Sequence, residues 1–357
     1  MLERDTLFFS QRMALLFGAL MGPAAELLPG TAAQAGGVGT AGVLAAAVAM
    51  VLAGSLMGRL ALQEGGLAQG VAEPFGKWGG RGILLIYMVW FQLQLTLRLR
   101  LTAQRLMAGG ERDGSAWFFV FALGAVCLWM AHGRLGSLGR SAQLFFLALA
   151  ITGAVVLVLA LTQTQRGNLL PQETLREVGA AAVLIPGINT LGYGLFAGFL
   201  IQKGWGRKEM RRWIRWAMTA GLALAVMQMI VIGCYGVRLT SRLPYPFFQL
   251  AKSVGVAGAF QRVESIVSAI WVLSDLLLLL GILWCMRRIG AVLCPRAVAE
   301  EVVTIAVLLA VVGSLALFGE KIPPRHLERL FLPAGSLILG IAIPALAILI
   351  KGVKGRR

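Results

Sequence analysis

The sequence predicts an all-α integral membrane protein with about ten transmembrane helices. Three observations lead to this fold class. Hydrophobic residues make up 58% of the 357 residues and charged residues only 14%, whereas roughly a quarter of the residues in soluble domains are charged. Apolar runs long enough to cross a bilayer recur from residue 7 to residue 350. The connections between these runs are short, so residues 1–357 are expected to form a single transmembrane domain.

Each helix is placed where about 20 mostly apolar residues follow one another, because a membrane-spanning segment must pair its backbone polar groups internally. The expected ranges are 7–29, 37–58, 82–106, 115–132, 141–162, 183–202, 213–236, 262–286, 298–318 and 331–350. The segments divide into two halves of five, which makes the first and the sixth helix corresponding members.

These two helices carry matching interruptions. The first contains Gly18 and Gly22-Pro23, and the sixth contains Pro186-Gly187. Proline removes a helical N–H group and clashes with the preceding turn. Broken helices at corresponding positions are typical of inverted-repeat (LeuT-like) transporters, whose substrate site lies at the breaks. The alternative is that these residues only kink the two helices, since Gly and Pro are common in membrane helices.

We expect both breaks to face one cavity, where freed N–H and carbonyl groups can bind the two charges of a zwitterion or a coupling cation. The candidate substrate-binding residues are Gly18, Gly22, Pro23, Glu26, Pro186, Gly187, Asn189, Thr190, Tyr193, Ser268 and Asp275. Asp275 is the acid placed deepest in the membrane, where a charge costs roughly several kcal/mol unless it is paired or hydrated. A role in substrate or proton binding and a structural role as a hydrogen-bonded acid both fit this position.

Other polar residues within the helices are expected to have structural roles. Glu264 is predicted to form a structural ion pair with Arg98 or Arg100 near one end of the bundle. The glutamines at positions 92, 94 and 228 are expected to form hydrogen bonds between helices.

An enzymatic function is not expected. The sequence contains no GxSxG, HExxH or Walker motif. Its four cysteines show no CxxC spacing, and there are two histidines, so neither a disulfide framework nor a metal site is indicated. No cofactor is predicted.

The net charge of +17 reflects basic residues in short connections rather than a nucleic-acid-binding face. The connection after the sixth helix is the most basic, with Lys203, Arg207, Lys208, Arg211, Arg212 and Arg215. Because positive connections lie on the cytoplasmic side, both termini are expected to be cytoplasmic. These residues also suit contacts with anionic lipid headgroups of the bilayer.

A cleaved signal peptide is the alternative for the first helix, because Ala33-Gln34-Ala35 resembles a signal-peptidase site. Glu26 and Gly22-Pro23 interrupt the apolar stretch before it, which favours a retained helix.

Several short motifs resemble the permease-like B subunit of endospore germinant receptors, a family of the amino acid/polyamine/organocation superfamily. They are Thr6-Leu7-Phe8-Phe9-Ser10, Leu97-Arg98, the stretch from Tyr245 to Lys252, the stretch from Phe260 to Ser265, and Ile270-Trp271. The resemblance covers nearly the whole chain.

The resemblance implies a ten-helix fold and a role in sensing amino acids or similar small-molecule germinants in the spore inner membrane. It also implies two partners, a membrane A subunit and a lipoprotein C subunit. Arg262 and Glu264 correspond to family residues, and the segment Gly18–Gly22 to the lining of the ligand site. Two features depart from the family pattern, namely Phe199-Leu200 after Gly198, and Asp275. A secondary amino-acid transporter coupled to a cation or proton is the alternative function.

Overall fold

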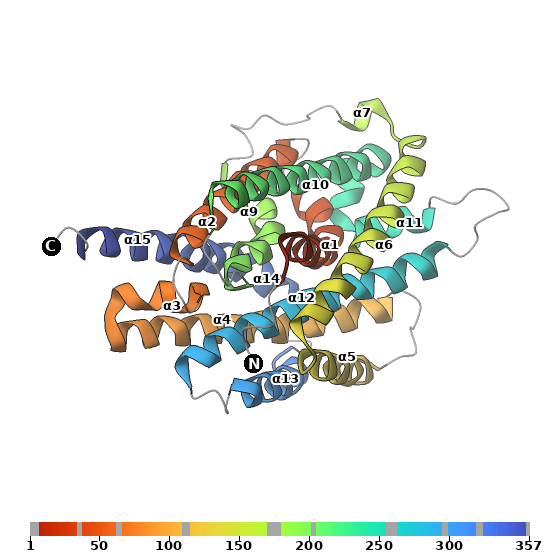
Figure 1. Ribbon diagram of the computed structural model, residues 1–357. Helices are drawn as coiled ribbons and strands as arrows, with labels where there is room; N and C mark the ends of the chain where they lie inside the picture. Colours follow the sequence, from red (N-terminus) through yellow and green to blue (C-terminus); the bar gives the residue numbers. More distant parts are fainter. Residues whose placement is uncertain are drawn as a thin grey trace.

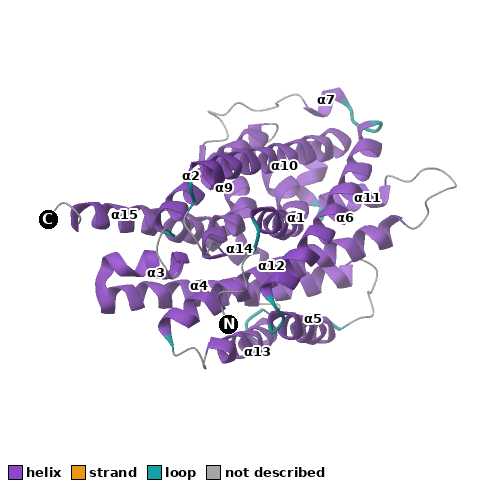
Figure 2. Cartoon of the chain, viewed as in Figure 1, coloured by secondary structure: helices purple, strands orange, loops and turns teal. Residues whose placement is uncertain are grey.

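The computed structural model describes residues 7–33, 38–61, 66–108, 115–169, 180–200, 205–243, 245–253, 263–294, 299–318 and 324–354. Within these ranges the chain is helical apart from short turns (Figure 2). The first half comprises α1 (Phe9–Ala33), α2 (Gly39–Leu60), α3 (Gly66–Ala72), η3 (Glu73–Phe75), α4 (Gly76–Ala108), α5 (Ala116–Ala131), α6 (Leu135–Leu161) and α7 (Arg166–Leu169). The second half comprises α9 (Ala180–Leu191), η4 (Gly192–Leu200), α10 (Arg207–Arg242), α11 (Pro246–Ser253), α12 (Val263–Leu293), α13 (Ala299–Ala316), α14 (Pro324–Leu337), η5 (Ile338–Ala342) and α15 (Ile343–Lys354).

Every helix range predicted from the sequence corresponds to helical structure. The largest extension is α10, where the basic segment before residue 213 continues the helix. The range 331–350 is covered by α14, the π-helical η5 and α15. The short helices α3, α7 and α11 lie in connections, where no apolar run of spanning length could indicate them.

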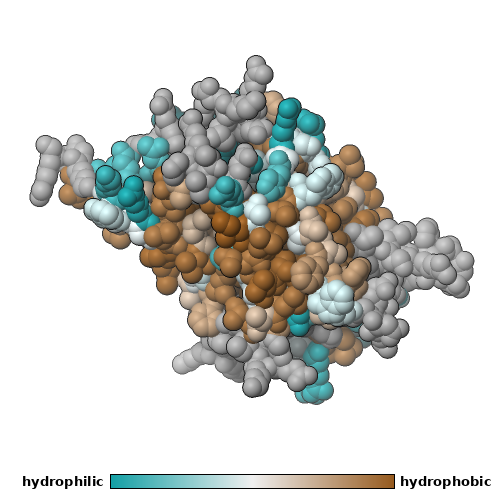
Figure 3. Space-filling view, turned by 90° about the horizontal axis from the view of Figure 1, so that it is seen from below, coloured by the Kyte–Doolittle hydropathy of each residue, from teal (hydrophilic) through white to brown (hydrophobic). Residues whose placement is uncertain are grey.

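The surface of the bundle suits a bilayer. Seven segments in the described part of the chain are long and apolar enough to cross a membrane, and α5 and most of α13 are shorter apolar helices. Large apolar side chains such as Trp129 and Val312 are exposed, and hydrophobic residues cover the middle of the face seen in Figure 3. Exposed apolar area of this extent would be unfavourable in water and is favourable in lipid. The chain is an integral membrane protein.

Helix α1 lies at the centre of the bundle, packed against α6, α9, α10 and α12 (Figure 1). The expected break at Gly22-Pro23 is wrong, because α1 is one continuous helix from Phe9 to Ala33. A neighbouring helix is bonded to α1 one turn before the proline, since the Ser274 hydroxyl of α12 donates a hydrogen bond to the Gly18 carbonyl. Packing against neighbouring helices allows proline within membrane helices.

The sixth predicted helix changes its geometry later than expected. α9 remains α-helical through Pro186-Gly187 to Leu191, and the chain continues as the 3₁₀-helix η4 from Gly192 to Leu200. Close packing holds this part of α9, because the Gly187 backbone lies against Gly42 of α2. The interruption in the second half is therefore a change of helical pitch at Gly192.

Candidate functional site

Four buried polar side chains lie along one face of α4. Gln94, Arg98, Thr102 and Arg105 are 2%, 1%, 2% and 6% exposed. Their spacing of four, four and three residues puts them on the same side of a helix. Polar and charged groups at membrane depth are unfavourable unless they are paired, and they commonly mark functional sites. This face of α4 is therefore where we locate the candidate site.

A cavity lies where this face of α4 meets α1, η4 and α12. Its free volume is small, about 30 Å³. Apolar side chains form most of its wall, among them Ala19, Phe91, Phe196 and Leu278. We call it the central cavity. α1 and η4 line this one cavity together, as expected for the first and sixth helices, although α1 is not broken there.

The central cavity has two polar side chains in its lining, Gln94 and Tyr193. The Gln94 Nε2 atom is buried and has no hydrogen-bond partner in the described part of the chain. The Tyr193 hydroxyl accepts a hydrogen bond of 2.7 Å from the Arg98 Nε atom, and the Arg98 guanidinium lies 4.7 Å from the centre of the Tyr193 ring. The cavity thus offers unused amide donors near a buried positive charge, an arrangement that suits an anionic or carbonyl acceptor.

A buried ion pair joins α4 to α12. The Arg105 guanidinium pairs with the Asp275 carboxylate, and Asp275 is only 1% exposed. The backbone of Gly22 lies directly against this carboxylate and against the Ser274 hydroxyl. Asp275 is therefore not isolated at this depth. Its partner is Arg105, which sequence analysis did not assign to it.

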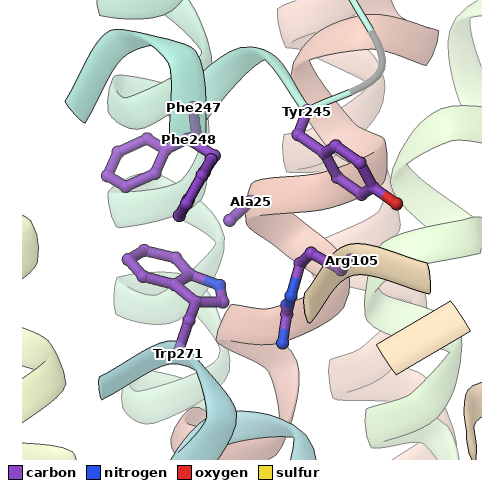
Figure 4. Close-up of a pocket in the computed structure, with 6 residues that line it drawn as sticks. All are labelled: Ala25, Arg105, Tyr245, Phe247, Phe248 and Trp271. Carbon is purple, nitrogen blue, oxygen red and sulfur yellow. The ribbon is translucent and has the colours of Figure 1, made fainter. Parts of the chain in front are cut away.

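A second cavity lies on the side of this ion pair that faces α11. Its free volume is only about 10 Å³, and its lining consists of Ala25, Arg105, Tyr245, Phe247, Phe248 and Trp271. Figure 4 shows aromatic rings from α11 and α12 and the Arg105 side chain around Ala25 of α1. The Phe247 and Trp271 rings are in contact, with centroids 4.9 Å apart. We call it the α11-side cavity.

The structure brings some of the predicted site residues together. Gly18, Gly22 and Asp275 meet at the contact between α1 and α12, and the adjacent Pro23 is buried. Tyr193 lines the central cavity.

Other predicted site residues lie elsewhere. A side chain at Gly187 would meet the Gly42 carbonyl oxygen of α2 at 2.5 Å, so Gly187 packs two helices together. Asn189 and Thr190 are fully buried but line neither cavity. The side chains of Glu26, Pro186 and Ser268 lie outside the described residues, and their roles stay predictions.

The predicted ion pair between Arg98 and Glu264 also stays a prediction, because the Glu264 side chain lies outside the described residues. Within the described part, the Arg98 guanidinium bonds to Tyr193.

Sequence analysis missed Arg105 and assigned Gln94 to contacts between helices. Gln92 does have that role, since its Nε2 atom donates to the Ala306 carbonyl of α13 at 3.1 Å. A signal for the missed residues was present in the spacing of Gln94, Arg98 and Arg105, which places all three on one face of a helix.

The fold and this site first define a class of protein, a membrane permease-like bundle with the LeuT-type architecture. The solved structure of MhsT in complex with L-phenylalanine has a TM-score of 0.69 to this chain, at 15% identity over 95% of this chain and 88% of that chain. A mutant manganese transporter from Eremococcus coleocola has a TM-score of 0.53, at 11% identity over 95% of this chain and 78% of that chain. These similarities establish the fold, and no curated protein matches the chain.

The family follows from the sequence itself. The spore permease family model, described as spore germination protein, matches residues 6–318. The chain therefore belongs to this family of spore germination proteins. The resemblance based on the motifs between Tyr245 and Trp271 is confirmed.

Proposed function

We propose that this chain is the permease-like subunit of a spore germinant receptor, which binds an amino acid or similar small solute within the membrane and signals germination. The observation that carries the proposal is the central cavity, where the Gln94 Nε2 atom is buried without a partner in the described part of the chain. An unsatisfied buried amide costs roughly 1–3 kcal/mol. A solute that accepts its hydrogen bonds would recover that free energy.

The chemistry of the cavity supports a solute with an acceptor group and a small apolar part. Gln94 supplies N–H donors, and the Arg98 guanidinium bonds to Tyr193, which lines the cavity. The remaining wall includes Phe91 and Phe196, whose rings are in contact at 5.2 Å between centroids. The MhsT structure of similar fold was solved with the amino acid L-phenylalanine, which agrees with an amino-acid ligand for this architecture. No enzymatic activity is proposed.

Two neighbouring glutamines of α4 provide the test. Gln94→Leu should weaken binding of the solute to the purified protein by about tenfold, because one good hydrogen bond is worth roughly 1.4 kcal/mol. Gln92→Leu is the matched control, since Gln92 bonds to α13 and does not line the cavity. Binding is measured by titrating amino acids, sugars and nucleosides. Equal affinities for both variants, or no binding by the unaltered protein, would contradict the proposal.

A secondary transporter is the second candidate function, because a solved structure with the same fold is a manganese transporter. Proteoliposomes separate the two functions. A transporter accumulates labelled solute under an ion or proton gradient, whereas a receptor subunit binds the solute without net uptake.

We further propose that the chain assembles with a membrane A subunit and a lipoprotein C subunit in the spore inner membrane. The family match supports this context. Co-purification of both subunits with a tagged form of this chain tests it, and recovery of the chain alone under mild detergent would count against it.

Both termini are proposed to be cytoplasmic. The exposed basic residues at the start of α10 support this orientation, among them Arg207, Lys208 and Arg211. Reporter fusions after residue 208 should report the cytoplasm, and fusions after residue 170 the opposite side. The reverse pattern would mean that both termini lie on the opposite side of the membrane.

A further inference from the structure

Helix α1 begins at the same end of the bundle as α6 and α10, and it packs against both (Figure 1). The Gln143 Nε2 atom of α6 donates a hydrogen bond of 3.3 Å to the Ser10 hydroxyl of α1. The Arg212 guanidinium of α10 lies 5.8 Å from the centre of the Phe9 ring of α1. The first turn of α1 is therefore in contact with the first turns of two neighbouring helices.

Two arginines meet at the Phe9 ring. The Arg12 guanidinium lies 5.9 Å from the ring centre and the Arg212 guanidinium 5.8 Å from it. The Arg12 Nε atom is buried and has no hydrogen-bond partner in the described part of the chain. Within the same part, no ion pair involves either arginine. Attraction to an aromatic ring is weaker than pairing with an anion, so these two cations lack the partner that would suit them best.

One acid lies nearby. Glu209 interacts electrostatically with Arg12, but its carboxylate lies at the first turn of its own helix, where its Oε2 atom would be 3.0 Å from a Cβ atom added to the N-cap Gly206. A carboxylate is favourable there because the start of a helix carries a partial positive charge. The basic side chains around it are exposed, namely Arg207, Lys208, Arg211, Arg212 and Arg215. A single acid leaves this end of the bundle with an excess of positive charge.

The positive charges adjoin an apolar surface of bilayer-spanning character. On α10 the exposed Arg215 is followed on the same side of the helix by Met218 and Leu222, which are also exposed. On α6 the exposed Arg140 is followed one turn later by the exposed Leu144. Both helices thus change from basic to apolar within about one turn. Such a change marks the boundary between lipid headgroups and hydrocarbon.

The ligand that fits this arrangement has an anionic head and apolar chains. A guanidinium group forms paired hydrogen bonds with two oxygens of a phosphate. A soluble phosphate would satisfy the charge but would leave the adjoining apolar surface unused. Phe8, which is 75% exposed at the start of α1, also suits insertion among headgroups and acyl chains rather than contact with water.

We propose that Arg12 and Arg212 bind the phosphate group of an anionic phospholipid. The Phe9 ring holds both guanidinium groups at the level of the headgroups, and the acyl chains lie along Leu144 of α6 and Leu222 of α10. The bound lipid ties the start of α1 to α10. This inference goes beyond the proposed function and does not depend on it, because no solute takes part in lipid binding.

The site also lies close to the central cavity along α1. Arg12 precedes Leu15 and Leu16 by about one helical turn, and both leucines line that cavity. A lipid that fixes the start of α1 therefore fixes a helix that forms part of the cavity wall.

The first experiment measures thermal unfolding of the full-length protein in a neutral detergent with added phosphatidylglycerol or phosphatidylcholine. Phosphatidylglycerol should raise the melting temperature by roughly 2–6 °C, and phosphatidylcholine should raise it by less than half as much. The difference should shrink in high salt, because screening weakens the contact with the phosphate. Native mass spectrometry of the same protein should show retained phosphatidylglycerol and no retained phosphatidylcholine. Equal shifts and equal retention for the two lipids overturn the proposal.

The second experiment locates the site. The double variant Arg12→Gln with Arg212→Gln should give the same shift with both lipids. The matched control is Arg59→Gln with Arg81→Gln, which removes two exposed arginines that do not lie over Phe9. Arg81 lies 5.8 Å from the centre of the Trp78 ring, so this control also removes one arginine from an aromatic ring. The control should keep the preference of the unaltered protein. If both double variants lose it equally, net charge rather than this site recognises the lipid, and the proposal is wrong.

Two other anions distinguish the remaining occupants. Inorganic phosphate and a poly-glutamate peptide should each leave the melting temperature of the unaltered protein unchanged. A shift with inorganic phosphate as large as that with phosphatidylglycerol would assign the site to a soluble phosphate. A shift with poly-glutamate but none with phosphatidylglycerol would assign it to an acidic segment of a protein partner. Either result overturns lipid binding, and both are measured on the unaltered protein, so they hold even if a variant fails to fold.

Discussion

Gly22 of α1 and Gly187 of α9 occupy corresponding places in the two five-helix halves, and each is adjacent to a proline. They contact different groups. Gly22 makes room for the Asp275 carboxylate and the Ser274 hydroxyl. Gly187 makes room for the backbone of α2, with the Gly42 carbonyl oxygen 2.5 Å from the position of an added Cβ atom. The same pairing of glycine with proline lies against a buried ion pair in the first half and against the backbone of a neighbouring helix in the second half.

This difference shows how two halves of a repeat can diverge in function. In the first half, the close approach at glycine leaves room for a buried ion pair, whose Arg105 lines the α11-side cavity. In the second half, the close approach fixes α9 against α2, away from the lining of either cavity. The contact between α1 and α12 is therefore expected to control binding, and the contact between α2 and α9 to control stability.

Loss of one ion-pair partner should have the largest effect. Arg105→Leu leaves the Asp275 carboxylate buried without its cation, and breaking a buried pair costs about 3–5 kcal/mol. The double variant Arg105→Leu with Asp275→Leu removes both charges and should be more stable than the single variant. Thermal unfolding in detergent measures the stability of both variants. If the double variant were as unstable as the single variant, the unpaired charge of Asp275 would not be the cause of the instability.

Alanine at the two glycines tests the comparison directly. Gly187→Ala should lower stability by about 1–3 kcal/mol, because overpacking pushes α9 from α2, and should leave the ligand affinity of the folded protein unchanged. Gly22→Ala should lower affinity, because its Cβ atom displaces the Asp275 carboxylate. Affinity and melting temperature are measured for both variants. If Gly187→Ala lost affinity and Gly22→Ala kept it, the roles would be reversed. The contact between α2 and α9 would then control binding, and the contact between α1 and α12 would control stability.

The smallest effect is expected for Ser274→Ala. This change removes the hydrogen bond to the Gly18 carbonyl and should cost about 0.5–1.5 kcal/mol in stability. Ser274→Thr keeps a hydroxyl and serves as the control, provided that its methyl group is tolerated by Gly22. An unchanged melting temperature in Ser274→Ala would mean that packing alone holds α1 against α12 at the proline.

The helices were predictable because the bilayer imposes a local rule. A segment without water must be helical and about 20 residues long, so composition within a short window is sufficient to place it. The family could also be inferred from short motifs such as those between Tyr245 and Trp271. The breaks were predicted less well. Pro23 has a local tendency to interrupt α1, but Ser274, more than 250 residues later, bonds to the Gly18 carbonyl and holds α1 against α12.

The sequence by itself determined that the chain spans the membrane, where its helices lie, and that the ionisable group of Asp275 is placed at membrane depth. Only the tertiary structure decided that Asp275 pairs with Arg105, that Gln94 faces a cavity while Gln92 bonds to α13, and that Gly187 packs against α2. The physical reason is that hydrophobicity fixes the depth and length of a helix. The rotation of each helix, and hence which buried charge meets which, depends on side-chain packing between segments far apart in the chain.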